Sequence, residues 1–204
     1  PSRGISSKIF RKKIIMSLVE TDWLEKNINK VKIIDCSWHM PQSKRNGLEE
    51  YKKQHIQNAI FFDLDKNSKE DTNLPHMLVD ANRWEKIVSN MGISKNDKII
   101  IYDNSDVISS CRCWFNFIYF GHDPRLVHVL NGGLQKWINE KRDITNNETN
   151  IQLSKYQSYE KKGLVKDKKS IEQNINDQNF KVIDARSRDR FDGKVSEPRE
   201  NLRS

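Results

Sequence analysis

Four short runs along the first two thirds of the chain are apolar at nearly every position. They lie at about 31–36, 59–62, 98–102 and 127–130. Uninterrupted apolar runs of this length are typical of parallel strands that are covered on both faces of a sheet. The stretches beside them carry apolar residues at helical spacing and predict helices, at 17–28, 48–56, 81–93, 109–121 and 134–141.

Strands that alternate with helices of about ten residues indicate βαβ units. The sequence therefore predicts an α/β fold with a doubly wound, mainly parallel sheet over residues 17–144. In the first helix, we expect Thr21 to be the N-cap. Asp22 and Glu25 would then fall in the first turn, where the helix dipole favours acids.

The character of the chain changes after residue 144. Residues 145–166 are polar without a sustained helical period and are expected to form an interdomain linker. A helix is predicted at 166–175 and a strand at 180–187. Because FKVIDARS matches KVKIIDCS at corresponding positions, residues 167–204 are expected to begin a second, incomplete copy of the domain.

Residues 1–16 form an N-terminal extension without acids but with several Arg, Lys and Ser. That composition suits an organelle transit peptide. The alternative is that Met16 is the true start and the preceding residues are upstream readthrough. A cytoplasmic protein is expected in the second case and a mitochondrial one in the first.

Composition and charge limit the kinds of partner and compartment that fit this chain. The net charge is +8, but Lys and Arg are mixed with acids throughout, and no basic stripe with interleaved aromatics points to nucleic acid. No run approaches the roughly 20 apolar residues that span a bilayer. The cysteines, Cys36, Cys111 and Cys113, are odd in number and irregularly spaced. This favours a reducing compartment over a disulfide framework, and no metal or cofactor is expected.

Six segments in order resemble the tandem rhodanese-type sulfurtransferases of the 3-mercaptopyruvate/thiosulfate kind. They are IIDCSWHMP, YKKQHIQNAIFFDLD, LPHML, MGISKNDKIIIYD, FGH with VLNGGLQKW, and VIDARSRDRFDGKVSEPRENLRS. The resemblance implies a rhodanese domain used twice, with a first copy that is usually silent. The second copy carries a cysteine on a strand-to-helix loop, where backbone N–H groups stabilise its thiolate. That thiolate takes a sulfur atom from the donor and becomes a persulfide.

In the first copy, the resemblance places Asp103 at the cysteine position. A carboxylate can accept the same N–H groups but cannot hold a sulfur atom; alternatively, Asp103 only caps the following helix. The nucleophilic cysteine is expected beyond residue 204 and not in this chain. Cys111 and Cys113 would point about 200° apart on a helix, so at most one could face a cleft. No cysteine has an Arg six positions later, which excludes a cysteine-phosphatase arrangement.

Arg190 and Arg199 match the two arginines that the mercaptopyruvate branch uses to hold its substrate. A guanidinium suits a carboxylate or a thiosulfate dianion because it forms bidentate hydrogen bonds. Alternatively, Arg190 only pairs with Asp184 or Asp192.

Asp65 and His76 match a family pair that is proposed to reach across the cleft and polarise a serine of the second copy. The alternative is that these two polar groups only hold their loop together. Asn58 stands where the family commonly has Gly, and Asn tolerates a left-handed backbone.

The resemblance implies transfer of sulfane sulfur from 3-mercaptopyruvate or thiosulfate to a thiophilic acceptor, with the SEPR segment favouring mercaptopyruvate. The expected partners are a small anionic sulfur donor and a thiol acceptor such as thioredoxin or a small thiol, without nucleic acid or membrane. The rival from another class is a non-catalytic rhodanese-like module for binding or regulation.

Overall fold

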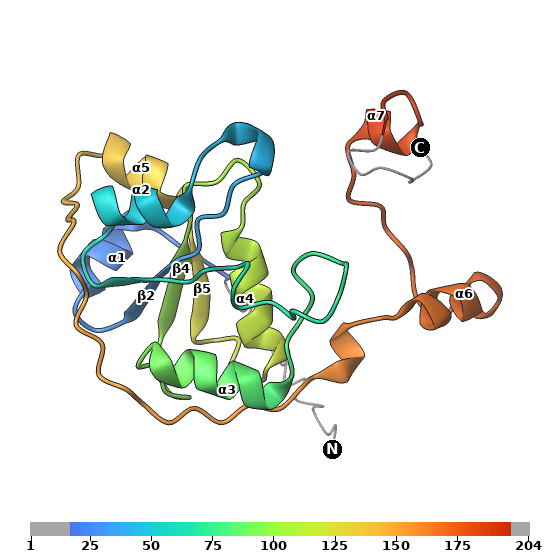
Figure 1. Cartoon of the computed structure of the whole chain (residues 1–204), viewed down its shortest axis with the longest axis horizontal. Helices are drawn as coiled ribbons and strands as arrows, with labels where there is room; N and C mark the ends of the chain where they lie inside the picture. The colour runs from blue at the N-terminus through green and yellow to red at the C-terminus, as the bar shows by residue number, and fades with distance from the viewer. Residues whose placement is uncertain (1–16, 197–204) are drawn as a thin grey trace, which may run out of the picture. The chain divides into compact units, whose positions relative to one another are not determined.

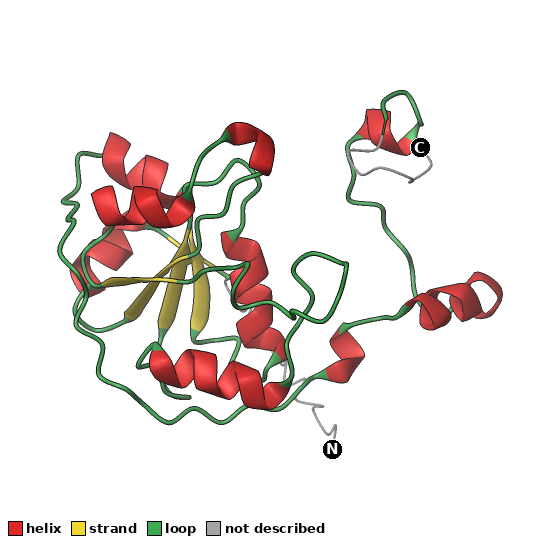
Figure 2. Cartoon of the chain, in the orientation of Figure 1, coloured by secondary structure: helices red, strands yellow, loops and turns green. Residues whose placement is uncertain are grey.

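The computed structural model describes residues 17–196. They fall into two compact units that divide between Lys162 and Gly163. Unit 1 contains a five-stranded parallel sheet in the order β1-β5-β4-β2-β3 (Figure 2). The strands are β1 (Leu18–Val19), β2 (Lys32–Asp35), β3 (Ala59–Phe61), β4 (Ile99–Tyr102) and β5 (Val127–Leu130). The four apolar runs are therefore strands, as predicted.

The two-residue strand β1 was not predicted. The sequence pattern placed residues 17–28 in one helix, but Leu18 and Val19 pair with Val129 and Leu130 of β5. The helix begins only at Thr21, and its N-cap is Glu20. The prediction that Thr21 caps it was wrong, because the Thr21 hydroxyl instead donates to the carboxylate of Glu140, at 2.6 Å.

Helices cover both faces of the sheet (Figure 1). On one face, α3 (Ala81–Asn90) and α4 (Ser110–Tyr119) pack onto the sheet through a cluster that includes Trp84 and Phe117. On the other face, α1 (Thr21–Asn27), α2 (Gly47–Lys53) and α5 (Gly133–Asn139) pack through a cluster that includes Leu24 and Trp137. Successive residues of β4 join opposite clusters, which is the mark of a strand buried on both sides. The doubly wound α/β prediction is confirmed.

The turn before β3 survives the replacement of the usual glycine. Asn58 adopts φ 65°, in the left-handed region. Its side-chain amide donates to Asn29 Oδ1 at 3.0 Å. Asn is among the non-glycine residues that tolerate this backbone best, so the turn geometry is kept.

The segment expected to be a linker, 145–166, is packed on unit 1 up to Lys162. Thr145 forms an antiparallel bridge with His55, and Ser154 N–H donates to the Ser89 carbonyl at 3.1 Å. Tyr156 is buried, and its hydroxyl lies 3.0 Å from Nδ1 of His122. The mainly polar sequence hid this packing, since hydrogen bonds and the single core side chain of Tyr156 fix the segment without a periodic apolar face.

Unit 2 contains α6 (Lys168–Asp177), as predicted, and the short α7 (Arg188–Phe191), with the 3-10 turn Lys162–Leu164 at the boundary between the units. The strand predicted at 180–187 is not formed in the described residues, and Val182 and Ile183 are exposed. A parallel strand needs neighbouring strands to satisfy its backbone groups, and no described segment pairs with this one. Asn174 is the only buried residue described in unit 2.

Asp35 at the end of β2 gives a stability prediction. Burial raises the pKa of its carboxyl to about 6, against a partly compensating hydrogen bond from the Ser37 amide. A raised folded-state pKa contributes stability below about pH 4 that is lost as pH rises to about 6. The free energy of unfolding of Asp35→Asn, measured relative to that of the parent chain, should therefore be roughly 3 kcal/mol higher at pH 7.5 than at pH 4. This follows from about 1.36 kcal/mol per pKa unit. Urea unfolding at both pH values measures this gain, and an equal effect at both would contradict it.

Candidate active site

The candidate site lies at the carboxyl ends of β2 and β4. These strands are neighbours in the sheet, and the helices that follow them, α2 and α4, cover opposite faces. The chain therefore leaves the two strands toward opposite faces of the sheet, through the loops 36–46 and 103–109. This is the switch point at which open α/β sheets bind ligands.

Asp103 sits directly after β4 and is buried. Its Oδ2 accepts the amide N–H of Ser110 at 2.6 Å, and Oδ1 accepts that of Ser105 at 3.3 Å. Ser110 is the first residue of α4, whose N-cap Ser109 makes no side-chain cap bond. The carboxylate thus caps the helix and accepts hydrogen bonds from two backbone N–H groups, those of Ser105 and Ser110.

The backbone of Asp103 is fixed by the turn before α5. Its carbonyl accepts the Leu134 N–H at 2.9 Å. Gly133, at φ 57°, approaches so closely that a Cβ there would lie 2.5 Å from the same carbonyl. Glycine is therefore required at position 133 for two reasons: the left-handed backbone and the close approach to the Asp103 carbonyl.

A pocket of about 520 Å³ opens beside Asp103 and is lined also by Arg45, Asn131 and Cys111. Cys113 is fully buried, so one cysteine of the pair faces the pocket and the other faces the core, as the helical period predicts. Burial raises the pKa of the Cys111 thiol, and the charge of Asp103 raises it further. Cys111 is therefore a poor thiolate at neutral pH.

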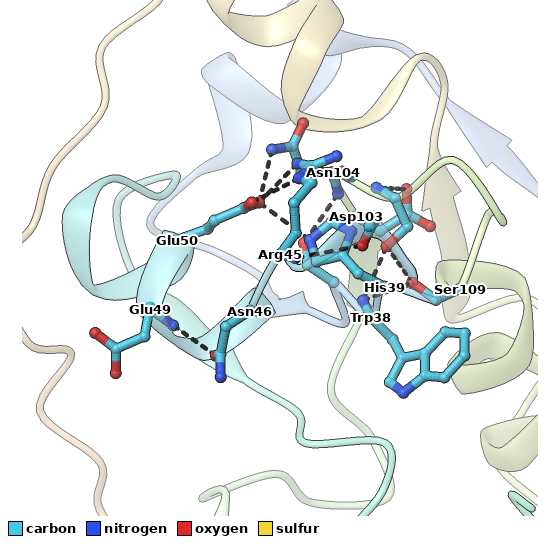
Figure 3. A network of polar contacts seen from close by, with 12 residues as sticks. Trp38, His39, Arg45, Asn46, Glu49, Glu50, Asp103, Asn104 and Ser109 are labelled. Atoms are coloured by element: carbon cyan, nitrogen blue, oxygen red, sulfur yellow. Dashed lines mark hydrogen bonds and ion pairs between the residues drawn. The ribbon is translucent and has the colours of Figure 1, made fainter. Parts of the chain in front are cut away.

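A polar network joins the two loops (Figure 3). Arg45 donates to both carboxylate oxygens of Glu50, at 2.7 and 2.8 Å, and to the Asn104 carbonyl at 3.1 Å. The Glu50 carboxylate also accepts a hydrogen bond from the side-chain amide of Asn104 at 3.1 Å and contacts Nε2 of His39 at 3.1 Å. Burial alone raises the pKa of Glu50, but its hydrogen bonds and the charges of His39 and Arg45 leave that pKa below its usual value. The network gives no local signal in the sequence, because its members come from three separate segments.

Two serines tie the 103–109 loop to the loop after β2. The Trp38 N–H lies 2.8 Å from Ser105 Oγ and 3.2 Å from Ser109 Oγ, and these hydroxyls are 2.8 Å apart. The Ser109 hydroxyl donates to the Cys36 carbonyl at 2.5 Å. Every polar group of the contact has a partner, which makes this a rigid junction.

Asp65 and His76, the candidate relay pair, lie together. Asp65 Oδ1 is 2.8 Å from Nε2 of His76, and the side chains are 67% and 22% exposed. The carboxylate is thus on the surface, and the imidazole is mostly covered. A carboxylate on one ring nitrogen leaves the other, Nδ1, to accept a proton from a partner.

Arg190 lies in α7 of unit 2. Asp184 holds Arg186 at 2.8 Å, and its pKa is lowered by the hydrogen bonds of Arg186 and also by the charge of Arg190. Arg190 therefore lies within electrostatic reach of Asp184, one of the two partners considered from the sequence. Arg199 lies outside the described residues.

The described part of the chain holds no group of three or more His, Cys, Asp or Glu residues that could bind a metal ion. Over the same residues, the helices are too short or too polar to cross a membrane.

Comparisons with known proteins agree with the fold and the motifs. The model of the rhodanese-like domain matches residues 20–140. Thiosulfate/3-mercaptopyruvate sulfurtransferase 1 of Arabidopsis thaliana, a mitochondrial protein, is 34% identical over 92% of the chain and 55% of its own length. The 3-mercaptopyruvate sulfurtransferase of Mus musculus is 29% identical over 93% of the chain and 66% of its own length.

Among solved structures, SseA of Escherichia coli, a 3-mercaptopyruvate sulfotransferase, superposes with a TM-score of 0.81 at 27% identity. The match covers 90% of this chain and 71% of that one. Tum1 of Saccharomyces cerevisiae gives 0.80 at 26% identity, over 93% of this chain and 67% of that one. The chain spans between about half and two thirds of the curated relatives named here. With a rhodanese-like domain over 20–140 and relatives that are sulfurtransferases along nearly all its length, the chain belongs to the rhodanese family.

Proposed function

We propose that unit 1 is the non-catalytic rhodanese domain of a two-domain sulfurtransferase, and that residues 167–204 begin the catalytic one. The observation that carries the proposal is Asp103. Its carboxylate occupies the N–H cradle after β4 in which a rhodanese nucleophile would sit. The relatives named above exceed this chain in length, which supports a nucleophile outside the 204 residues.

The proposed reaction moves sulfane sulfur from 3-mercaptopyruvate or thiosulfate to a thiophilic acceptor. A cysteine thiolate attacks the thiol sulfur of mercaptopyruvate or the outer sulfur of thiosulfate. The C–S or S–S bond of the donor breaks, and its electron pair leaves with the enolate of pyruvate, which takes up a proton, or with sulfite. The resulting persulfide gives its outer sulfur to cyanide, to a small thiol or to thioredoxin. Arg190 and Arg199 would bind the donor anion, and the SEPR segment favours mercaptopyruvate.

We propose a relay role for Asp65 and His76. With Nε2–H donated to Asp65, Nδ1 can accept the proton of a serine hydroxyl from the second domain. The cellular site is proposed to be cytoplasmic, or mitochondrial if residues 1–15 act as a transit peptide. A fluorescent fusion with and without these residues separates the two.

The alternative, a binding or regulatory module, is favoured by the same carboxylate, since Asp103 removes the nucleophile from the site of unit 1. The two functions differ in a longer protein that contains this chain followed by the proposed second domain, called the longer protein below. Turnover with mercaptopyruvate there supports the enzyme, and its absence supports the module.

A cysteine installed in the cradle tests the assignment of Asp103. In a Cys111→Ser background, the sulfur introduced by Asp103→Cys should accept hydrogen bonds from the backbone N–H groups of Ser105 and Ser110. These hydrogen bonds stabilise a thiolate. It should react with iodoacetamide at pH 7 about tenfold faster than Cys111 of the parent chain. Peptide mapping by mass spectrometry gives both rates. A thiol at position 103 that reacts no faster than Cys111 would show that the loop is only a helix cap.

A further inference from the structure

The Asp65–His76 pair has two neighbours that the proposed function leaves without a role. The Trp38 indole Nε1–H lies 3.1 Å from each carboxylate oxygen of Asp65. The Trp38 ring also meets the His76 ring edge to face, with centroids 4.7 Å apart and an interplanar angle of 87°. Trp38 therefore contacts both members of the pair and restricts both.

Trp38 is itself held by the loop that carries Asp103. Its backbone N–H contacts the hydroxyls of Ser105 and Ser109, as described above. The backbone that carries the indole is thus fixed by the junction between the loops after β2 and β4. Because Asp65 is 67% exposed, its carboxylate would otherwise sample several rotamers in water.

The second neighbour acts on the backbone of His76. Arg112, on α4, donates through Nη2 to the carbonyl oxygen of His76. His76 adopts φ 55°, a left-handed conformation that is uncommon for residues other than glycine.

Arg112 is committed to this contact. Burial lowers the pKa of its guanidinium, and its Nε is buried without a hydrogen-bond partner among the described residues. The side chain also lies over the Phe115 ring, 5.9 Å from the centroid. A half-buried guanidinium is costly unless it is hydrogen-bonded, and here Nη2 is satisfied by the carbonyl of His76.

We infer that Trp38 and Arg112 are positioning residues for the Asp65–His76 pair. Trp38 fixes the carboxylate and the ring plane, and Arg112 holds the left-handed backbone that aims the imidazole at Asp65. The inference deepens the proposed function, since it rests on the relay role of the pair. Its geometric part is separable, because it concerns contacts within unit 1 that exist whether or not sulfur is transferred.

The test is the ring N–H proton of His76 in the ¹⁵N-labelled 204-residue chain at pH 8. A ring N–H is visible by NMR only where a hydrogen bond slows its exchange with water. We expect to see this N–H signal in the parent chain. In Trp38→Phe and in Arg112→Met, the proton should exchange with water about five- to tenfold faster, because each variant loses one hydrogen bond that restrains the pair. Arg112→Lys, which keeps a donor, should restore part of the protection.

Matched controls separate positioning from general loss of structure. Trp114→Phe removes an indole on α4 that donates to the Val127 carbonyl, and Arg125→Met removes an exposed guanidinium paired with Asp123. Both should leave the His76 signal unchanged. The ring N–H of His122, which contacts the Asp97 carbonyl at 3.0 Å, should stay constant in every variant and reports that the fold is intact.

Equal protection of His76 in the parent, Trp38→Phe and Arg112→Met would overturn the inference. So would a loss in Arg112→Met that Arg112→Lys fails to restore while His122 stays constant. Failure of the proposed function would appear elsewhere: full turnover in an Asp65→Asn variant of the longer protein would remove the relay role and leave the positioning result standing.

Discussion

The 204-residue chain is expected to show no sulfurtransferase turnover above the rate in buffer. Each of its three cysteines lacks what a persulfide-forming nucleophile needs. Cys36 and Cys113 are fully buried, and burial raises the pKa of the Cys36 thiol far above its usual value. Cys111 faces the pocket, but its pKa is also raised. The N–H cradle that would stabilise a thiolate holds the carboxylate of Asp103, which cannot accept sulfur.

The measurement is thiocyanate formation by the purified chain with mercaptopyruvate or thiosulfate and cyanide, with the longer protein as the positive control. Turnover that disappears in Cys111→Ser would make unit 1 a catalyst and contradict the expectation. Turnover that persists in that variant is assigned by Cys36→Ser and Cys113→Ser.

The second large effect concerns the proposed donor-binding arginines. In the longer protein, Arg190→Ala and Arg199→Ala should each raise the KM for mercaptopyruvate by a factor of roughly 10 to 150. The reason is that a hydrogen bond to a charged group contributes about 1.5–3 kcal/mol. Lysine at either position should rescue poorly, since it lacks the planar fork that binds a carboxylate through two parallel hydrogen bonds.

Arg188 supplies the matched control for this series. Arg188 lies in α7 with Arg190, is largely exposed and pairs with Asp192 at 3.1 Å. Arg188→Ala should leave the KM unchanged. If all three variants keep the parental KM, Arg190 and Arg199 do not bind the donor. If all three raise it equally, the effect is one of general charge and not of a specific site.

The sheet could be predicted because most positions in its longer strands are apolar. A strand such as β4, buried at each of its four positions, is readable without knowing its neighbours. Leu18 and Val19 are only two residues beside a helical pattern, so β1 becomes visible only when β5 is in place. The packing of the segment after residue 144 was not predicted for a related reason: its partners, such as Ser89 and His122, are far away in the sequence.

The candidate site divides in the same way. Asp103 and the Asp65–His76 pair could be named because the resemblance carried them, and the structure brings Asp65 and His76 together. Trp38 and Arg112 carry no signal in local spacing. Trp38 is 27 residues from Asp65, and Arg112 is 36 residues from His76, so only the folded chain shows that these contacts exist. The same holds for Glu50 and Asn104, which are separated by 54 residues.

Unit 1 is proposed to support sulfur transfer without itself carrying the sulfur. The most direct measurement is mass spectrometry of the longer protein after brief exposure to mercaptopyruvate without an acceptor, with trapping of persulfides and peptide mapping. The account predicts one added sulfur atom on a cysteine outside residues 1–204, with Cys36, Cys111 and Cys113 unmodified. Added sulfur on Cys111 or on either of the other two would contradict it.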